Sequence, residues 1–505
     1  MTSRRALFAL LAFAAAAIWL MQGAGYNQNS HYALVKALAE GTPRIDTTRF
    51  ETGYLSTQDL AYDEGHYFSD KPPGLAAVAL PAYVALRAAG VRTSGDPTVM
   101  LWALGLVGVV LPTVLLIVLM ALVVEAFEPR MGLPVALVLG AGTLLLPFST
   151  MFFSHALSAL LVFAAFAAAW RARQGPLAWL ALAGLLTAFA VTVEYSNAVA
   201  GAAIGIYALT RRGAIVRRAA VYGGAFLAGL VPLLAYHWWA FGSPFESARS
   251  HALYFRGEDA IERAGETGGL FGLEAFPSLG RAVTLLFSEW GLLAATPIVF
   301  LALLGLLALA RQGWRAEALL IGSLWLMYLL LSMSYYSIFG DFAGGPRYLV
   351  PVLPLLALPL AAATRRWPGE ALGLTLASVA MMAGLTLARP LFATEGALLT
   401  RLRERQFPPT AASLIDVSSI SAALLFPILV AVALVVAATM LPQRRLRREH
   451  VIAAALVLVA WLVVRESAVR LLDTGASDMR SLAVVAIAAI AVTGYAVVRR
   501  LVVTR

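Results

Sequence analysis

Apolar stretches of roughly 20 residues recur along the whole chain and are separated by shorter polar segments. Each stretch is long enough to cross a hydrocarbon core of about 30 Å as a helix. The pattern therefore predicts an all-α polytopic membrane protein. We expect spans at Leu7 to Ala24 and at about 98–124, 132–151, 155–170, 177–193, 195–210, 219–237, 288–310, 317–337, 348–364, 371–388, 419–441, 451–465 and 481–498.

One apolar segment, Gly74 to Gly90, is short and carries Pro81. If this segment lies along the outer surface, the arginine-bearing loops all fall on the same side as Arg4 and Arg5. Short cytoplasmic loops carry an excess of positive charge, and this rule favours the surface position. Most of the acidic residues then lie outside, in long outer segments at 25–97, 238–287 and 389–418. We expect a catalytic transmembrane module over 1–388, followed by an outer loop and C-terminal helices over 389–505.

Composition supports the membrane interpretation. Hydrophobic residues make up 60% of the chain and charged residues 13%, about half the usual share of a soluble domain. The net charge of +10 comes from arginines in short loops, which membrane orientation explains better than nucleic-acid binding. The absence of cysteine excludes disulfides and cysteine-ligated metals.

The first outer loop gathers several carboxylates. Its beginning, "SHYALVKALAEG", predicts an amphipathic helix on the membrane surface that stops at Gly41. Asp46, Asp59 and Asp70 follow, and such a cluster would suit a general base, a divalent cation (Mg²⁺, Mn²⁺ or Ca²⁺) or simple solvation. No spacing specifies a metal, so the sequence leaves these alternatives open.

Lys71 has an unusual position in this loop. The chain holds 38 basic residues, of which only Lys36 and Lys71 are lysines. Lys71 precedes two prolines, which fix the backbone where the chain enters an apolar helix. A compact ammonium held in this way suggests a point-charge contact, and phosphate is a natural partner.

Further outer-face residues are candidates for a ligand site. Glu194 lies between two apolar stretches, where a carboxylate is costly and functional by default. His155 begins a span, and His251 lies in "FESARSHALYF" with Arg249 and Arg256 nearby. Asp341 and Arg347 flank Gly344-Gly345-Pro346, a turn that opens the next span. A structural histidine or a snorkelling arginine would explain these residues too.

The surface helix, followed by an acid and Lys-Pro-Pro opening an apolar helix, resembles the C-type (GT-C) integral membrane glycosyltransferases. The aminoarabinose transferase and protein O-mannosyltransferase branch is the most similar in pattern. The resemblance implies a bundle of about 12 to 14 transmembrane helices. It also implies an inverting enzyme that moves a sugar from a polyprenyl-phosphate donor to a cell-envelope glycan, lipid or protein.

The chain departs from this family at one place. Gln28 and Asn29 stand where the family usually has an acidic pair, and neither amide can take a proton. The base must therefore come from elsewhere in the loop. Carried onto this sequence, the resemblance implies catalytic residues (Asp46, Asp59, Asp70), donor-phosphate ligands (Lys71, Arg347, His155, His251) and substrate contacts (Glu194, Tyr195, Asp341, His66, Tyr67).

The expected location is a bacterial inner membrane, with the site on the periplasmic or extracellular face. The expected partners are the lipid donor, an acceptor and membrane lipid, and not nucleic acid. Two alternatives stay open. A transporter or lipid flippase would show charges at mid-membrane and internal repeats. A polysaccharide ligase or polymerase would take a polyprenyl-diphosphate donor instead.

Overall fold

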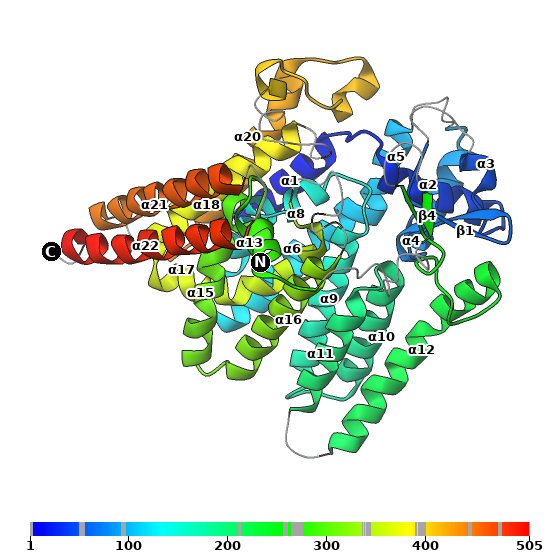
Figure 1. Ribbon diagram of the computed structural model, residues 1–505, viewed down its shortest axis with the longest axis horizontal. Coiled ribbons are helices and arrows are strands. Elements are labelled where there is room, and N and C mark those ends of the chain that lie inside the picture. Colours follow the sequence, from blue (N-terminus) through cyan, green and yellow to red (C-terminus); the bar gives the residue numbers. More distant parts are fainter. Residues whose placement is uncertain are drawn as a thin grey trace. The chain divides into compact units, whose positions relative to one another are not determined.

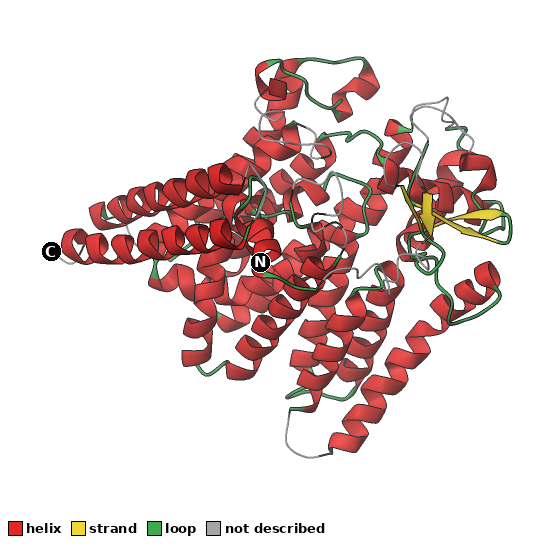
Figure 2. Ribbon diagram, viewed as in Figure 1, coloured by secondary structure: helices red, strands yellow, loops and turns green. Residues whose placement is uncertain are grey.

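The computed structural model describes residues 4–49, 56–91, 97–210, 214–255, 261–263, 276–335, 337, 339, 345–388, 391, 400–442, 447–472 and 477–503. Helices dominate this part of the chain, and its strands form only two short hairpins (Figure 2). Eight helices are long and apolar enough to cross a membrane, or nine if a bent pair counts as one span. The expected all-α polytopic membrane fold is confirmed.

The chain packs as two units. Unit 1 comprises Met1–Leu20, Ile117–Pro147 and Ala275–Arg505, and unit 2 comprises Met21–Leu116 and Phe148–Glu274. The predicted boundary at residue 388 falls inside unit 1. The division into a catalytic module and a C-terminal part stays a prediction.

Unit 1 holds most of the long helices. The helix pair α21 and α22 and the pair α1 and α20 each pack along their lengths (Figure 1). Its elements are α1 (Arg4–Trp19), α7 (Gly132–Gly142), α13 (Leu279–Phe287), α14 (Leu292–Ala295), α15 (Ile298–Arg311), α16 (Arg315–Ser334), the 3₁₀ helix η3 (Arg347–Leu356), α17 (Ala357–Arg366), α18 (Pro368–Leu387), η4 (Ala411–Ile415), α20 (Ile420–Ala438), α21 (Arg448–Leu472) and α22 (Asp478–Val503).

Unit 2 combines the first outer loop with a group of apolar helices. Helices α9, α10, α11 and α12 pack against one another, and α2 packs against α4 (Figure 1). Its elements are α2 (Tyr26–Ala39), α3 (Asp46–Arg49), β1 (Leu60–Asp63), β2 (His66–Ser69), α4 (Gly74–Ala88), α5 (Thr98–Gly105), the π-helical turn η2 (Leu106–Val110), α9 (His155–Arg171), α10 (Ala178–Val193), α11 (Asn197–Leu209), α12 (Ile215–Phe241), β3 (Leu253–Phe255) and β4 (Ile261–Arg263). Helices α6 (Leu111–Phe127) and α8 (Leu145–Phe148) each contain one of the four points where the chain passes between the units.

Two predicted spans are not continuous helices. The segment 132–151 breaks after Gly142, because Thr143 adopts an extended backbone, and continues as the single turn α8. The segment 288–310 contains a bend of 86° between Ala295 and Ile298. Pro297 explains this bend, since it lacks an N–H and disfavours the helical conformation of the preceding residue.

The predicted span 98–124 is continuous through Pro112, running from Thr98 to Phe127. A π-helical turn at Leu106–Val110 lies directly before this proline. Such local adjustments accommodate the hydrogen bond that proline cannot make. Whether Gly74–Ala88 crosses the membrane or lies on its surface stays a prediction.

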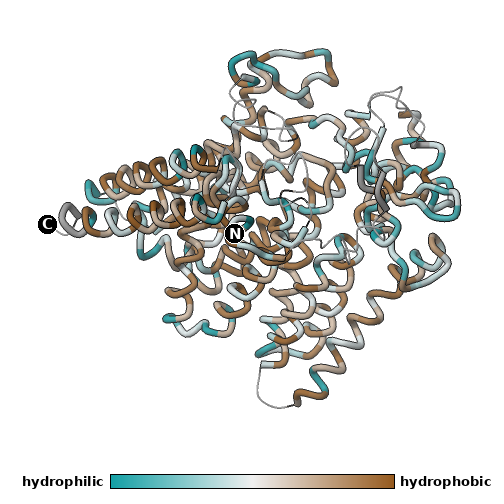
Figure 3. The backbone as a smooth tube through the Cα atoms, viewed as in Figure 1, coloured by the Kyte–Doolittle hydropathy of each residue, from teal (hydrophilic) through white to brown (hydrophobic). Residues whose placement is uncertain are grey.

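The helix predicted from "SHYALVKALAEG" is confirmed as α2, but its predicted position on the surface is wrong. The helix is followed by Gly41 in a left-handed conformation (φ 76°), as expected. However, the polar residues Gln28, Asn29, Ser30 and His31 are buried along with its apolar ones. A surface helix would expose its polar face, so α2 is instead an internal helix of unit 2. Figure 3 shows the hydrophilic positions concentrated in the loops and the first-loop hairpin.

Candidate functional site

A β-hairpin positions the Asp70-Lys71 pair. Strands β1 and β2 pair in register from Leu60 opposite Ser69 to Asp63 opposite His66. Glu64 and Gly65 form the two-residue turn, both with positive φ, as tight hairpin turns require. The sequence "LAYDEGHYFS" alternates around this turn, so the hairpin was detectable from the pattern, although we did not predict it.

The two faces of the hairpin pack on different neighbours. Leu60 joins an apolar cluster with Ala33 and Ala37 of α2, while Phe68 joins one with Phe241 of α12. The hairpin is thus held between α2 and α12. The chain leaves β2 at Ser69 and places the next two residues, Asp70 and Lys71, at the end of this packing.

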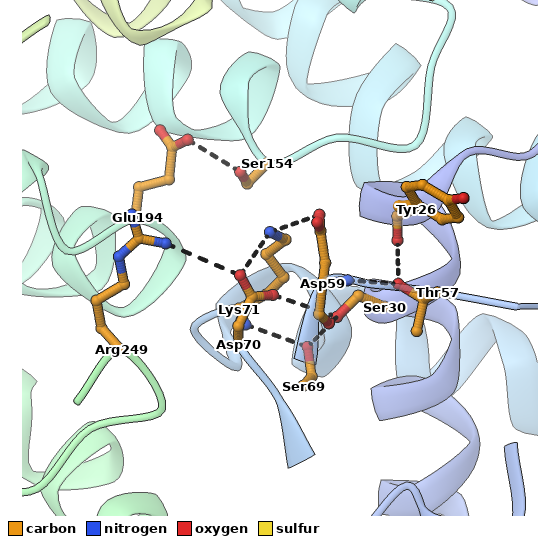
Figure 4. A network of polar contacts seen from close by, with 10 residues as sticks. All are labelled: Tyr26, Ser30, Thr57, Asp59, Ser69, Asp70, Lys71, Ser154, Glu194 and Arg249. Atoms are coloured by element: carbon orange, nitrogen blue, oxygen red, sulfur yellow. Dashed lines mark hydrogen bonds and ion pairs between the residues drawn. The ribbon is translucent and has the colours of Figure 1, made fainter. Parts of the chain in front are cut away.

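Four charged side chains meet there (Figure 4). Lys71 Nζ lies 2.8 Å from Asp59 Oδ2 and 3.0 Å from Asp70 Oδ2. Arg249 Nη1 lies 3.9 Å from the same Asp70 oxygen. The Asp70 side chain is only 9% exposed, whereas that of Asp59 is 29% exposed. This arrangement is the ion network of unit 2, and it brings together two of the three predicted catalytic aspartates and the predicted phosphate ligand Lys71.

Ser30 of α2 bonds the two chain segments that carry the carboxylates of the ion network. The Ser30 hydroxyl donates to the Asp59 carbonyl at 2.7 Å and lies 2.7 Å from the Ser69 hydroxyl. Ser69 in turn accepts the backbone N–H of Lys71 at 3.2 Å. Because these bonds join the helix to both carboxylate-bearing segments, Ser30 fixes the spacing of Asp59 relative to Asp70.

Arg249 reaches this network because the loop after α12 docks on the hairpin. Tyr62 N–H donates to the His251 carbonyl at 2.9 Å, and Ala61 forms an isolated bridge with Ala252. Arg249 was noted in the sequence only as one of several basic residues near His251. Its contact with Asp70 depends on strand pairing between two distant loops, which the sequence pattern did not reveal.

Burial raises the pKa of Asp70. Desolvation raises its pKa above the ordinary value of 3.8, while Lys71 and Arg249 oppose this rise. A buried carboxylate with two nearby cations is held in place firmly but keeps its proton more readily than a solvated one. Asp70 therefore suits a positioning role, and the more exposed Asp59 is better placed to meet a substrate.

A second cluster lies at the end of α10. His155 Nδ1 is 2.5 Å from Glu194 Oε1. The Ser154 hydroxyl donates to the same oxygen at 3.1 Å (Figure 4). Burial alone would raise the pKa of Glu194, but His155 and the neighbouring hydroxyls outweigh it and leave the pKa lowered. Glu194 is therefore a stable anion.

His155 is the partner that stabilises and orients Glu194. A share of His155 in binding a phosphate stays a prediction.

Gly74 connects the two clusters. A Cβ built on this residue would lie 2.6 Å from Val193 Cγ2 and 2.7 Å from the Thr192 carbonyl oxygen. Only glycine permits such a close backbone approach. The start of α4, three residues after Lys71, is therefore seated directly on the end of α10, one residue before Glu194.

An apolar pocket of about 320 Å³ is lined in part by Pro73. It is lined from α2, α4, α10 and α12 by Leu38, Pro73, Ala77, Thr192, Pro232, Ala235, Tyr236 and Trp239. Pro73 lies two residues after Lys71. Polar and apolar binding surfaces are thus adjacent along the chain.

Asp46 and His66 contact each other directly. Asp46 Oδ2 lies 2.8 Å from His66 Nδ1, and its other oxygen accepts the backbone N–H of Tyr67 at 2.7 Å. The Tyr67 ring packs on Tyr62 across the hairpin. These contacts tie α3 to β2 and favour structural roles for all three predicted site residues.

His251 lies between two carboxylates. Its Nδ1 is 3.4 Å from Asp63 and its Nε2 is 3.4 Å from Glu246. Its ring stacks on Phe241. These contacts anchor the loop that carries Arg249, and a share of His251 in phosphate binding stays a prediction.

The other predicted site residues are less connected to the ion network. The Tyr195 hydroxyl forms a hydrogen bond with His237 Nε2 at 3.0 Å. Burial raises the pKa of Tyr195, so this hydroxyl stays protonated. Arg347 begins η3 in unit 1, with its guanidinium 5.4 Å from the Tyr348 ring centroid. Its share in binding the same phosphate as Lys71 stays a prediction. Asp341 lies outside the described residues.

A divalent cation has no evident site. Among the described residues, no three His, Cys, Asp or Glu side chains converge as metal ligands would. The expectation of a cation therefore stays untested.

Comparisons with known proteins give distant structural similarities. No protein-family model and no curated protein matches the sequence. The fold is similar to ArnT from Cupriavidus metallidurans in the apo state, with 16% identity and a TM-score of 0.47, over 98% of this chain and 75% of that one. ArnT bound to undecaprenyl phosphate gives 15% identity and a TM-score of 0.43, over 98% and 76%.

A third similar structure is the apo oligosaccharyltransferase of Archaeoglobus fulgidus, with 14% identity and a TM-score of 0.43. The match covers 92% of this chain and 59% of the oligosaccharyltransferase. Both similar proteins are GT-C glycosyltransferases.

Proposed function

We propose that this protein is an inverting membrane glycosyltransferase that uses a polyprenyl-phosphate-linked sugar. The observation that carries the proposal is the position of Lys71. It lies in the ion network with Asp59, Asp70 and Arg249, two residues before Pro73 in the wall of an apolar pocket. A ligand that fills both surfaces has an anionic head and a long apolar chain.

A lipid phosphate has this form. Lys71 and Arg249 would share the phosphate oxygens in charge-assisted bonds, and the chain would enter the pocket beside Pro73. The pocket specifies an apolar chain, and the resemblance of the first loop favours a polyprenyl one. Undecaprenyl phosphate is the ligand in one of the similar ArnT structures.

The reaction would be a single displacement at the anomeric carbon. Asp59 takes the proton of an acceptor hydroxyl, and the acceptor oxygen bonds to the anomeric carbon from the face opposite the phosphate. The carbon–oxygen bond to the phosphate breaks as the new bond forms. The departing lipid phosphate keeps the electron pair, and Lys71 and Arg249 stabilise its charge.

Binding of the lipid tests the first half of this proposal. Purified protein in detergent should be stabilised against heat by undecaprenyl phosphate, and much less by undecaprenol, which lacks the phosphate. The Lys71→Met and Arg249→Met variants should each lose most of this difference. Equal stabilisation by both lipids would show that the ion network binds no phosphate.

Transfer tests the second half. The donors are undecaprenyl phosphates carrying labelled arabinose or mannose, the acceptors are membrane extracts, and release of undecaprenyl phosphate is the readout. Asp59→Asn should lower the rate by about 10²–10⁴-fold, and Glu64→Gln, an exposed carboxylate in the turn of the same hairpin, serves as the control. Full activity of Asp59→Asn would remove Asp59 as the base. Turnover of only diphosphate-linked donors would indicate a ligase or polymerase, and lipid binding without any transfer would favour a flippase.

A further inference from the structure

Several buried polar side chains of unit 2 have atoms without a hydrogen-bond partner among the described residues, and three of these side chains are His31, His155 and Glu194. His31 is 1% exposed, and both of its ring nitrogens lack such a partner. Nε2 of His155, which is 4% exposed, and Oε2 of Glu194 lack one too. More than nine in ten buried polar groups in proteins are hydrogen-bonded. These atoms are therefore available to bond a ligand.

These residues belong to one region of unit 2. The His31 ring meets Phe152 edge-on at 6.2 Å, three residues before His155. The charges of Lys71, Asp59, Glu194 and His155 all act on His31. Its neighbour Ser30 bonds the backbone of Asp59 and the hydroxyl of Ser69. His31 is therefore close to both the ion network and the Glu194–His155 pair.

The chemistry of the three groups restricts the ligand. Burial, together with Lys71, lowers the pKa of His31 to about 3, so its imidazole is neutral and offers one donor and one acceptor. Glu194 is an anion that accepts hydrogen bonds and repels negative charge. Because the described His and Glu side chains do not converge as metal ligands, an extended ligand with several hydroxyls fits better than a cation.

We propose that His31, His155 and Glu194 form the subsite for the donor sugar, and that Glu194 selects neutral or amine-bearing sugars against acidic ones. The inference rests on the proposed function, because it takes the sugar to be linked to the phosphate held at Lys71. The sugar hydroxyls supply the partners that the imidazoles and the free carboxylate oxygen lack. A uronic acid would place its carboxylate against Glu194 and is disfavoured.

The experiment compares three lipids on the same purified protein. Bare undecaprenyl phosphate tests the phosphate site alone, and undecaprenyl phosphates carrying glucose or glucuronic acid test the subsite. Wild type should bind the glucosyl lipid at least about tenfold more tightly than the glucuronosyl lipid, as expected for one unfavourable charge contact. Glu194→Gln should reduce this discrimination several-fold and leave the affinity for bare undecaprenyl phosphate unchanged.

Two further variants separate a binding role from a structural one. His31→Gln and His155→Gln should weaken the glucosyl lipid by about tenfold to a hundredfold without changing the affinity for bare undecaprenyl phosphate. His450→Gln, in unit 1, is the control and should change neither.

The outcomes distinguish the two proposals. If wild type binds bare undecaprenyl phosphate but does not discriminate glucose from glucuronic acid, the subsite assignment is wrong and the lipid-phosphate site stands. The assignment also fails if the Gln variants lower the affinity for the bare and the glucosyl lipid equally. If wild type binds none of the three lipids, the proposed function itself is wrong.

Discussion

Gly74→Ala probes the contact that joins the ion network to the end of α10. The added methyl carbon would lie 2.7 Å from the Thr192 carbonyl oxygen, about 0.7 Å closer than the 3.4 Å at which ordinary contact begins. The two contacted atoms, the Thr192 carbonyl oxygen and Val193 Cγ2, belong to the backbone and to a short side chain, so they cannot rotate away. Overpacking of this kind costs about 1–3 kcal/mol.

The consequence for function follows from the position of Gly74. To relieve the contact, α4 must move away from α10 by several tenths of an ångström, and Lys71 moves with it. A misplacement of about 1 Å at a reacting centre lowers rates by about a hundredfold. We therefore expect Gly74→Ala to fold with a lowered unfolding temperature and to release undecaprenyl phosphate about ten to a hundred times more slowly.

The assay measures both properties on one preparation, with thermal unfolding in detergent and donor turnover per folded molecule. Gly224→Ala is the matched control, because Gly224 lies in α12 and a Cβ there meets nothing within 4 Å. That variant should be as stable as wild type or more stable by up to about 1 kcal/mol. If Gly74→Ala behaves like Gly224→Ala in both measurements, the close seating of α4 on α10 has no functional importance.

Two further predictions concern charge. The pKa of Asp70 is raised by burial, so the folded chain retains a proton that the unfolded chain has lost. Stability should fall as pH rises above the ordinary value of 3.8, and Asp70→Asn should flatten this slope in thermal unfolding between about pH 4 and pH 7. In unit 1, the buried carboxylate of Glu370 accepts from Tyr495 at 2.6 Å and from Arg499 at 2.5 Å. Glu370→Gln should cost about 2 kcal/mol in unfolding measurements, less than a fully buried pair because Arg499 is 30% exposed, and an unchanged unfolding temperature would contradict this.

Hydropathy predicted most of the helices, but it did not predict where a helix breaks or bends. The length of an apolar run decides whether a helix can span a membrane, and this holds for runs such as Ile420–Ala438. It says nothing of the bend at Pro297 or of the break after Gly142. The polar side chains of α2 were assigned to solvent because their partners are remote in sequence: Asn29 donates to the Ser56 carbonyl and Ser30 to that of Asp59.

The residues of the candidate site were likewise predictable from the sequence only in part. Asp59, Asp70 and Lys71 share one loop, so local sequence was enough to associate them. Arg249 is nearly 180 residues away, and its approach depends on the bridge between Ala61 and Ala252. His31 lies within the predicted surface helix, and only its burial marks it as a candidate. Asp46 looked equivalent to Asp59 until its bonds to His66 and Tyr67 were seen.

The ion network carries two negative and two positive formal charges, Asp59 and Asp70 against Lys71 and Arg249. A phosphate that enters adds negative charge to a compartment that was electrically balanced. Asp70, which already holds its proton more readily than a solvated aspartate, is the group best suited to restore the balance. Binding of a lipid phosphate would then draw a hydrogen ion from the buffer, so its affinity would rise towards acidic pH.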